Sequence, residues 1–150
     1  MKLKKINHEL IQLIGNINSY RDIFLNKKLA QLGDIFVNFI YSISLSIVLK
    51  KLSGKKVSGK ILMQALRDSK LNNYIPSRLS VHDIADAVEA IIFYTWLVEK
   101  MDMNEMINIL IEELSYGDFS KKRYEIDISI IAFTKLLDKI SELNILNKNL

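Results

Sequence analysis

Two short segments of the sequence carry acidic residues that could bind a divalent cation, and the first surrounds Asp34. Gly33 interrupts a strongly apolar helical pattern there, at a cost of about 1 kcal/mol relative to alanine. Such a glycine favours the close approach of another backbone or of a ligand. Asp34 directly precedes a run of core residues, so we expect its carboxylate near the buried edge of the domain, where an ionised group needs a partner. A metal ion is one such partner, and a capping contact or a salt bridge is the other interpretation.

The second segment places Asp86 and Glu89 three residues apart in an expected helix. Residues at this spacing share a helix face, so the two carboxylates lie side by side. The alanines around them, Ala85, Ala87 and Ala90, let another helix or a phosphate come close. Adjacent like charges repel each other, which favours a divalent cation between them. A solvated acidic face is the alternative interpretation.

The residue types that the chain lacks, or has few of, exclude several kinds of catalytic and metal site. The 150 residues include no cysteine, which excludes a disulfide framework, a thiol nucleophile and a zinc–cysteine site. The two histidines, His8 and His82, argue against a multi-histidine metal site within one chain. The formal net charge of +4 permits a nucleic-acid partner without establishing one. Two basic clusters could contact phosphates or could be solvated loops: Lys50, Lys51, Lys55, Lys56 and Lys60, and Lys121, Lys122 and Arg123.

The elements that must position these residues are expected to be helices throughout. Hydrophobic residues make up 49% of the chain, and there are one proline and five glycines to interrupt helices. Ser80 with Asp83, and Asp102 with Glu105, have the spacing of helix starts. We expect one all-α domain over residues 1–150, with helices near residues 6–17, 28–51, 61–66, 81–96, 103–116 and 128–143, a break at 50–60 and a loop at 72–76.

No membrane partner is expected. No apolar run with a small-residue cleavage site follows the basic start of the chain, so a secretory signal is not indicated. The most apolar stretch, residues 35–49, is shorter than a bilayer-spanning helix of about 20 residues, and Asn38 and three serines interrupt it. This pattern predicts a helix buried on nearly all sides, in a cytoplasmic protein.

Taken together, the two acidic segments resemble the signatures of the ribonuclease III catalytic domain. Leu32-Gly33-Asp34 matches the end of that family's Glu-x-Leu-Gly-Asp signature, and Asp86-Ala87-Val88-Glu89-Ala90 matches its Asp-x-x-Glu-Ala signature. Between them, Val57-Ser58-Gly59-Lys60 is similar to the family's Val-Ser-Asn-Lys stretch. The resemblance covers roughly residues 29–100, in the family's order.

One family carboxylate is missing, because Ala30 stands where the signature has glutamate. No double-stranded-RNA-binding domain follows before Leu150, so the chain is similar to the short Mini-III branch, which also tolerates alanine at this position. The resemblance implies a homodimeric endoribonuclease that cleaves double-stranded or structured RNA with Mg²⁺, or with Mn²⁺. It assigns Asp34 and Glu89 as metal ligands and catalytic residues, with Asp86 as a ligand or as a residue orienting metal-bound water.

Phosphate contacts would come from Lys55, Lys56 and Lys60. The apolar stretch at residues 35–49 also favours a dimer, because one small helical domain cannot easily bury it. Two alternatives stay open. The chain could be a catalytically impaired ribonuclease III-like dimer that binds RNA or a protein, which Ala30 favours, or a structural helical dimer whose acidic residues form salt bridges.

Overall fold

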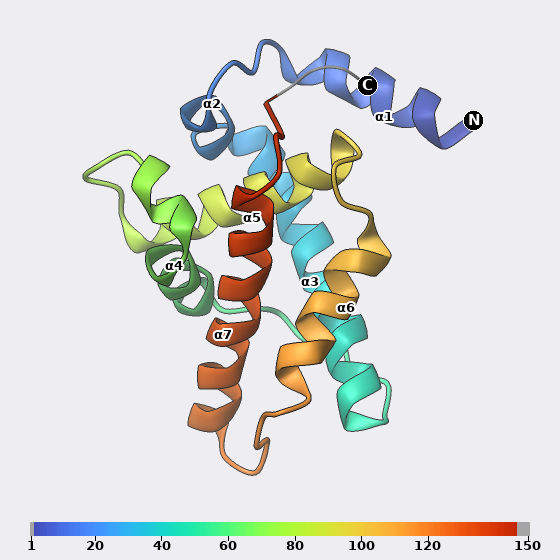
Figure 1. The fold of residues 1–150 in the computed structure, drawn as a ribbon, viewed down its shortest axis with the longest axis vertical. Helices are drawn as coiled ribbons and strands as arrows, with labels where there is room; N and C mark the ends of the chain where they lie inside the picture. Colours follow the sequence, from blue (N-terminus) through green and yellow to red (C-terminus); the bar gives the residue numbers. More distant parts are fainter. Residues whose placement is uncertain (1, 147–150) are drawn as a thin grey trace.

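The computed structural model describes the backbone of residues 2–146 and the side chains from residue 6 onward, and over this range it is helical with no strand. Figure 1 shows the helices gathered around a central one, α5. The elements in chain order are α1 (Lys2–Ile14), α2 (Tyr20–Phe24), α3 (Lys27–Leu49), α4 (Gly59–Asp68), the 3-10 helix η1 (Lys70–Tyr74), α5 (Val81–Leu97), α6 (Met103–Leu114) and α7 (Lys122–Ser141). The all-α prediction is confirmed.

Helix α5 is buried along most of its length, and its neighbours surround it. Its longest interface is with α3, and α4 and α2 pack against its other sides. Helices α6 and α7 lie side by side and are joined by a loop at the lower end of the molecule (Figure 1). They cover α3 and α4 respectively. The α3–α5 interface is therefore the centre of the fold, and it carries both acidic segments.

Both expected helix starts are present. The Ser80 hydroxyl accepts a hydrogen bond from the Asp83 N–H at 3.1 Å, and the Asp83 carboxylate reaches back to the Ser80 N–H, which completes a capping box. The Asp102 carboxylate accepts from the Glu105 N–H at 2.8 Å at the start of α6. The capping box at Ser80 fixes where α5 begins, and so fixes the depth at which its acidic residues enter the interface.

Three local expectations were wrong. Helix α1 ends at Ile14 rather than near residue 17, because Gly15 adopts φ +90°. The short helix α2 was not expected, because a five-residue helix shows too little periodicity. The stretch expected as a loop at residues 72–76 is instead largely the 3-10 helix η1.

The sequence predicted that helix α3 would be buried on nearly all sides, and this prediction was wrong. Ile35 is 70% exposed and Phe39 is 51% exposed, and Leu32 and Ile47 on the same helix are exposed as well. The opposite side of α3 is buried against α5 and α6. By length and composition α3 would also suit a membrane span, a property that it shares with the core helices of soluble proteins. The single chain therefore leaves an apolar stripe on α3 uncovered.

Candidate active site

The acidic segments meet because Gly33 lets α3 and α5 touch backbone to backbone. A Cβ atom at Gly33 would lie 2.2 Å from the carbonyl oxygen of Glu89, a separation that no real side chain could adopt. The expectation of a close backbone approach at this glycine is confirmed. As a result, the next residue along α3, Asp34, stands beside the Glu89 side chain.

A cavity of about 440 Å³ opens at this crossing, between α3, α5 and the segment that precedes α4. The structure brings all three expected acidic residues, Asp34, Asp86 and Glu89, to its wall. Ala30 also lines it, so a longer side chain at that position would enter the cavity. Two lysines, Lys27 and Lys56, complete the charged lining, and the exposed His82 also lines the cavity.

Glu89 and Asp34 form a close carboxylate pair. Glu89 is only 9% exposed. Burial, a hydrogen bond with Asp34 and the negative charges of Asp34 and Asp86 together raise the pKa of Glu89 from 4.5 to about 8, while the charge of Lys56 acts in the opposite direction. At neutral pH the pair therefore shares a proton, because two ionised carboxylates this close would repel each other. A divalent cation relieves the same repulsion, so the pair fits a hard metal ion.

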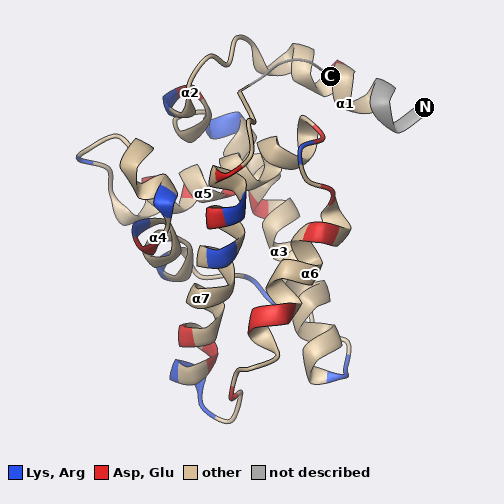
Figure 2. Cartoon of the chain, in the orientation of Figure 1, with Lys and Arg blue, Asp and Glu red and all other residues tan. Residues whose placement is uncertain are grey.

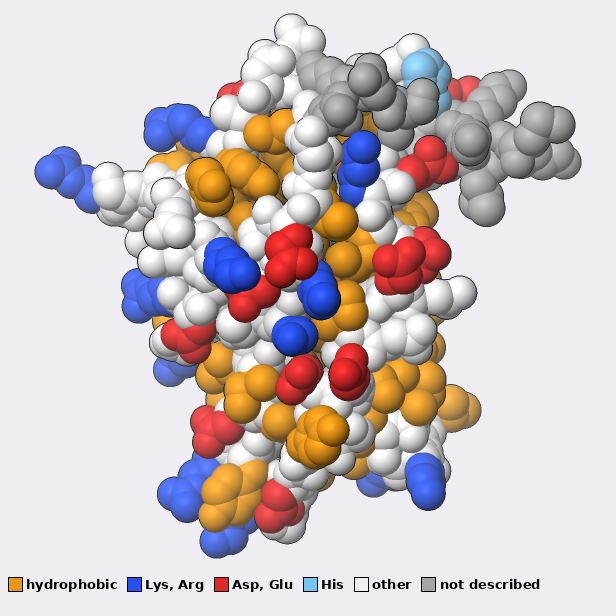
Figure 3. Space-filling model, in the orientation of Figure 1, with side chains coloured by type: hydrophobic (Ala, Val, Ile, Leu, Met, Phe, Trp, Pro, Cys, Tyr) orange, Lys and Arg blue, Asp and Glu red, His pale blue; other side chains and the backbone are white. Residues whose placement is uncertain are grey.

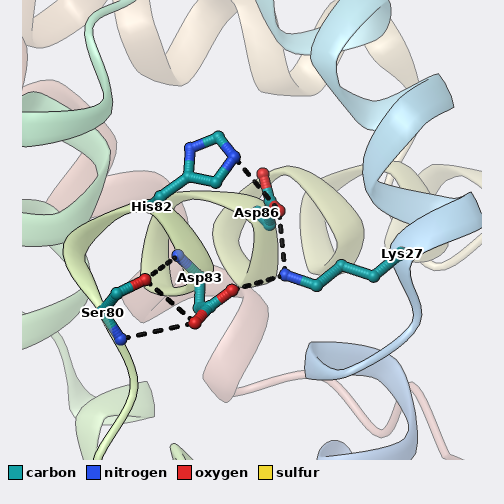
Figure 4. A network of polar contacts seen from close by, with 5 residues as sticks. All are labelled: Lys27, Ser80, His82, Asp83 and Asp86. Atoms are coloured by element: carbon teal, nitrogen blue, oxygen red, sulfur yellow. Dashed lines mark hydrogen bonds and ion pairs between the residues drawn. The ribbon is translucent and has the colours of Figure 1, made fainter.

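Asp86 is held differently, as Figure 4 shows. The Lys27 ammonium reaches from the start of α3 to the first turns of α5, donating to Asp86 at 2.9 Å and to Asp83 at 2.7 Å. These two contacts raise the pKa of Lys27, and the bonds from Lys27 and Ser80 lower the pKa of Asp83 to about 2. Lys27 is thus a cation that Asp86 shares with Asp83 in this arrangement.

The three carboxylates share a cavity without forming a ready-made metal cage. In the part of the chain that the structure describes, no three acidic or histidine side chains are close enough to hold a metal ion together. Asp34 and Glu89 can supply two oxygen ligands, and Asp86 would have to leave Lys27 or act through water. The roles of the three residues as metal ligands stay predictions.

The structure separates the three lysines that were expected to bind RNA. Lys56 lines the cavity beside Glu89. Lys55 forms an ion pair with Glu125 of α7, and the exposed Lys60 lies in the first turn of α4, outside the cavity wall. Only Lys56 is therefore placed to meet a phosphate at the carboxylate pair.

The second basic cluster lies at the lower end of α7 and does not line the cavity (Figure 2). The Arg123 guanidinium stacks on the Tyr124 ring, with 5.0 Å between its central carbon and the ring centroid. Over the rest of the face formed by α7, Figure 3 shows acidic and basic side chains interspersed. That face offers no extended surface of a single charge.

Sequence reasoning missed two residues at the site, Lys27 and Asn38. The Asn38 amide nitrogen donates to the Asp34 carboxylate at 2.9 Å, and its amide oxygen accepts from the Val57 N–H at 2.8 Å. The four-residue spacing from Asp34 to Asn38 was a usable signal, because residues at i and i+4 face each other on a helix. No local pattern links Lys27 to a residue 59 positions away in the sequence.

The chain is similar to a known protein family over most of its length. A family model described as Ribonuclease III matches residues 27–145, a range that includes every residue lining the cavity. No curated protein matches the chain.

Proposed function

Because that match covers most of its length, the chain belongs to the ribonuclease III family, and we propose that it is a metal-dependent endoribonuclease acting on double-stranded or structured RNA. The observation that carries this proposal is the Asp34–Glu89 carboxylate pair at the wall of one cavity, with Asp86 on the same wall. Membership of the family suggests RNA endonuclease activity, and this site supplies the groups for the metal-dependent form of that chemistry.

Four residues of the cavity have a task in this proposal. Asp34 and Glu89 would hold Mg²⁺, or Mn²⁺, with their carboxylate oxygens, which would require Glu89 to release its proton. When bound, the cation would supply an activated water and would balance negative charge on the phosphate. Asp86 orients water or becomes a further ligand, and Lys56 neutralises a phosphate of the RNA backbone. Recognition rests on the shape and phosphates of an A-form duplex rather than on base sequence.

The proposed enzyme works as a homodimer, and the support for this is the exposed stripe on α3. Leu32, Ile35 and Phe39 lie on one face of that helix and are substantially exposed in the single chain. Apolar surface of this kind is costly in water, and a second copy of the same stripe would cover it. Light scattering should give twice the chain mass, and Ile35→Asp should give the monomer, because each charge would be buried in the interface. A monomeric natural protein at micromolar concentration would reject the dimer.

The direct test of the function is cleavage of a long RNA duplex by the purified protein, with and without Mg²⁺. We expect cleavage that requires the metal and is lost in Glu89→Gln, which keeps the shape of the side chain and removes its charge. Glu112→Gln is the matched control, because Glu112 is exposed on α6 and does not line the cavity. Equal loss of activity in both variants would reject the assignment of the site.

A second candidate function is RNA binding without cleavage, which two observations favour. Ala30 leaves the cavity without a fourth carboxylate, and Asp86 already pairs with Lys27. Binding of the duplex that is independent of Mg²⁺, with no cleavage at any metal concentration, would support this non-catalytic function. A dimer that binds neither RNA nor metal would instead fit the interaction-protein alternative.

A further inference from the structure

One face of α3 carries a row of polar side chains that hold a neighbouring segment by its backbone. The row consists of Asn38, Ser42 and Ser46, each four residues after the last, so they lie one above the other on the helix. All three are partly exposed and lie between the buried side of α3 and solvent. The segment that they hold, residues 53–57, precedes α4 and contains Lys56.

The contacts form a ladder in which the segment runs antiparallel to α3. Each side-chain oxygen accepts a hydrogen bond from one backbone N–H, and the donors are every second residue of the segment. The distances are 2.9 Å from Ser53 to Ser46, 2.8 Å from Lys55 to Ser42 and 2.8 Å from Val57 to Asn38. Four helical residues rise about 6 Å, and two extended residues span about 6.6 Å, so the two repeats match. This match explains how a segment without regular secondary structure is fixed along its length.

The last contact of the ladder differs from the other two because it also reaches the candidate metal site. The Asn38 oxygen accepts from Val57, and the Asn38 nitrogen donates to the Asp34 carboxylate at 2.9 Å. A single amide therefore joins Asp34 to the residue that directly follows Lys56. Ser42 and Ser46 make no hydrogen bond to any acidic residue of the cavity.

We propose that Asn38 is a positioning residue that fixes Lys56 and Asp34 relative to each other, so that phosphate binding and metal binding are coupled. The inference rests on the proposed function, because it takes Asp34 as a metal ligand and Lys56 as a phosphate ligand. With Asn38 in place, the RNA phosphate held by Lys56 arrives at a fixed distance from the cation held by Asp34. Without Asn38, the segment keeps its Ser42 and Ser46 contacts but loses its register against Asp34.

The test measures two equilibria separately: Mn²⁺ binding by calorimetry without RNA, and binding of a short RNA duplex in EDTA. The variants are Asn38→Ala, Lys56→Ala, their combination, and Ser42→Ala as the matched control. Asn38→Ala should weaken Mn²⁺ binding by about tenfold, the effect typical of removing a hydrogen-bond partner of a metal ligand. Ser42→Ala should weaken duplex binding by a few-fold and leave Mn²⁺ binding unchanged, since it loosens the segment without touching Asp34.

Coupling also predicts that the substitutions will not be additive. Lys56→Ala should weaken duplex binding several-fold in the natural protein and much less in the Asn38→Ala background, where Lys56 is already misplaced. If Asn38→Ala unfolds the protein, Asn38→Ser takes its place, because its shorter side chain cannot reach both partners.

Equal Mn²⁺ affinity in Asn38→Ala and Ser42→Ala, or additive losses of duplex binding, would overturn the coupling even if the natural protein cleaves RNA. A natural protein that binds Mn²⁺ and duplex without cleaving would reject the proposed hydrolysis, and the coupling would still be decided by these affinities. A natural protein that binds neither would reject both.

Discussion

The protonated state of Glu89 makes a prediction about stability that does not depend on activity. Its pKa in the folded protein is about 8, against an ordinary value of 4.5, so the folded state holds a proton that the unfolded state releases above pH 4.5. A group with this sign of shift destabilises the fold as the pH rises from 4.5 to 8. The loss between pH 5 and pH 8 amounts to roughly 3 kcal/mol for a shift of this size. That is a large part of the stability of a domain of this length.

Glu89→Gln should remove this pH dependence. The amide cannot ionise, and it can still donate a hydrogen bond to Asp34 in place of the carboxylic acid proton. Without metal, we expect the variant to be more stable than the natural protein at pH 8 and about equal to it at pH 5. The measurement is urea unfolding at several pH values in EDTA, with Glu112→Gln as the control that should follow the natural protein.

Metal binding should raise the stability of the natural protein, which is the opposite of the effect of raising the pH. At pH 8, millimolar Mg²⁺ should raise its free energy of unfolding, because the cation replaces the shared proton between Asp34 and Glu89. The same Mg²⁺ should leave Glu89→Gln nearly unchanged. Equal pH slopes in the two proteins would refute the burial argument for Glu89, and equal stabilisation by Mg²⁺ would refute the metal assignment.

Three further substitutions test the roles of other residues at the cavity. Ala30→Glu should lower the Mg²⁺ concentration needed for duplex cleavage by about tenfold, because it adds a carboxylate to the cavity wall. If the natural protein does not cleave RNA, the same substitution should start cleavage. Full activity in a variant that combines Ala30→Glu with Glu89→Gln would reject the assignment of the site. Gly33→Ala should cost about 3 kcal/mol in urea unfolding, because its Cβ would overlap the Glu89 carbonyl oxygen, and an unchanged midpoint would refute the backbone contact. Lys27→Met should raise Mn²⁺ affinity measured by calorimetry, because it frees Asp86, and an unchanged affinity would show that Asp86 takes no part.

The prediction that the two acidic segments meet rests on their joint resemblance to the ribonuclease III signatures, and local rules supply only part of it. Gly33 signals a close contact within an apolar helix, and the spacing of Asp86 and Glu89 puts them on one helix face. The capping box at Ser80 then sets where the second helix starts. These signals survive in a single sequence because each one depends on residues only a few positions apart.

The remaining features depend on contacts between distant residues, which composition and periodicity do not encode. Lys27 meets Asp86 only because α3 begins where α5 begins. The pairing of Lys55 with Glu125, rather than with RNA, depends on how α7 packs against the segment before α4. The exposure of Ile35 could not be read from hydropathy, since an apolar residue covered by its own chain and one left for a partner have the same sequence signal.

The balance between cutting and only binding RNA depends on the charge inside the cavity. Asp34, Asp86 and Glu89 face Lys27 and Lys56 there, and the shared proton on Glu89 removes one further negative charge at neutral pH. Before metal binds, the cavity is therefore close to neutral, which favours the approach of an RNA phosphate more than a strongly acidic site would. The same balance weakens the pull on a divalent cation, so metal should bind more tightly at higher pH, where Glu89 has lost its proton. A phosphate brought in by Lys56 adds negative charge beside the carboxylates and strengthens that pull, so RNA and metal should each promote the binding of the other.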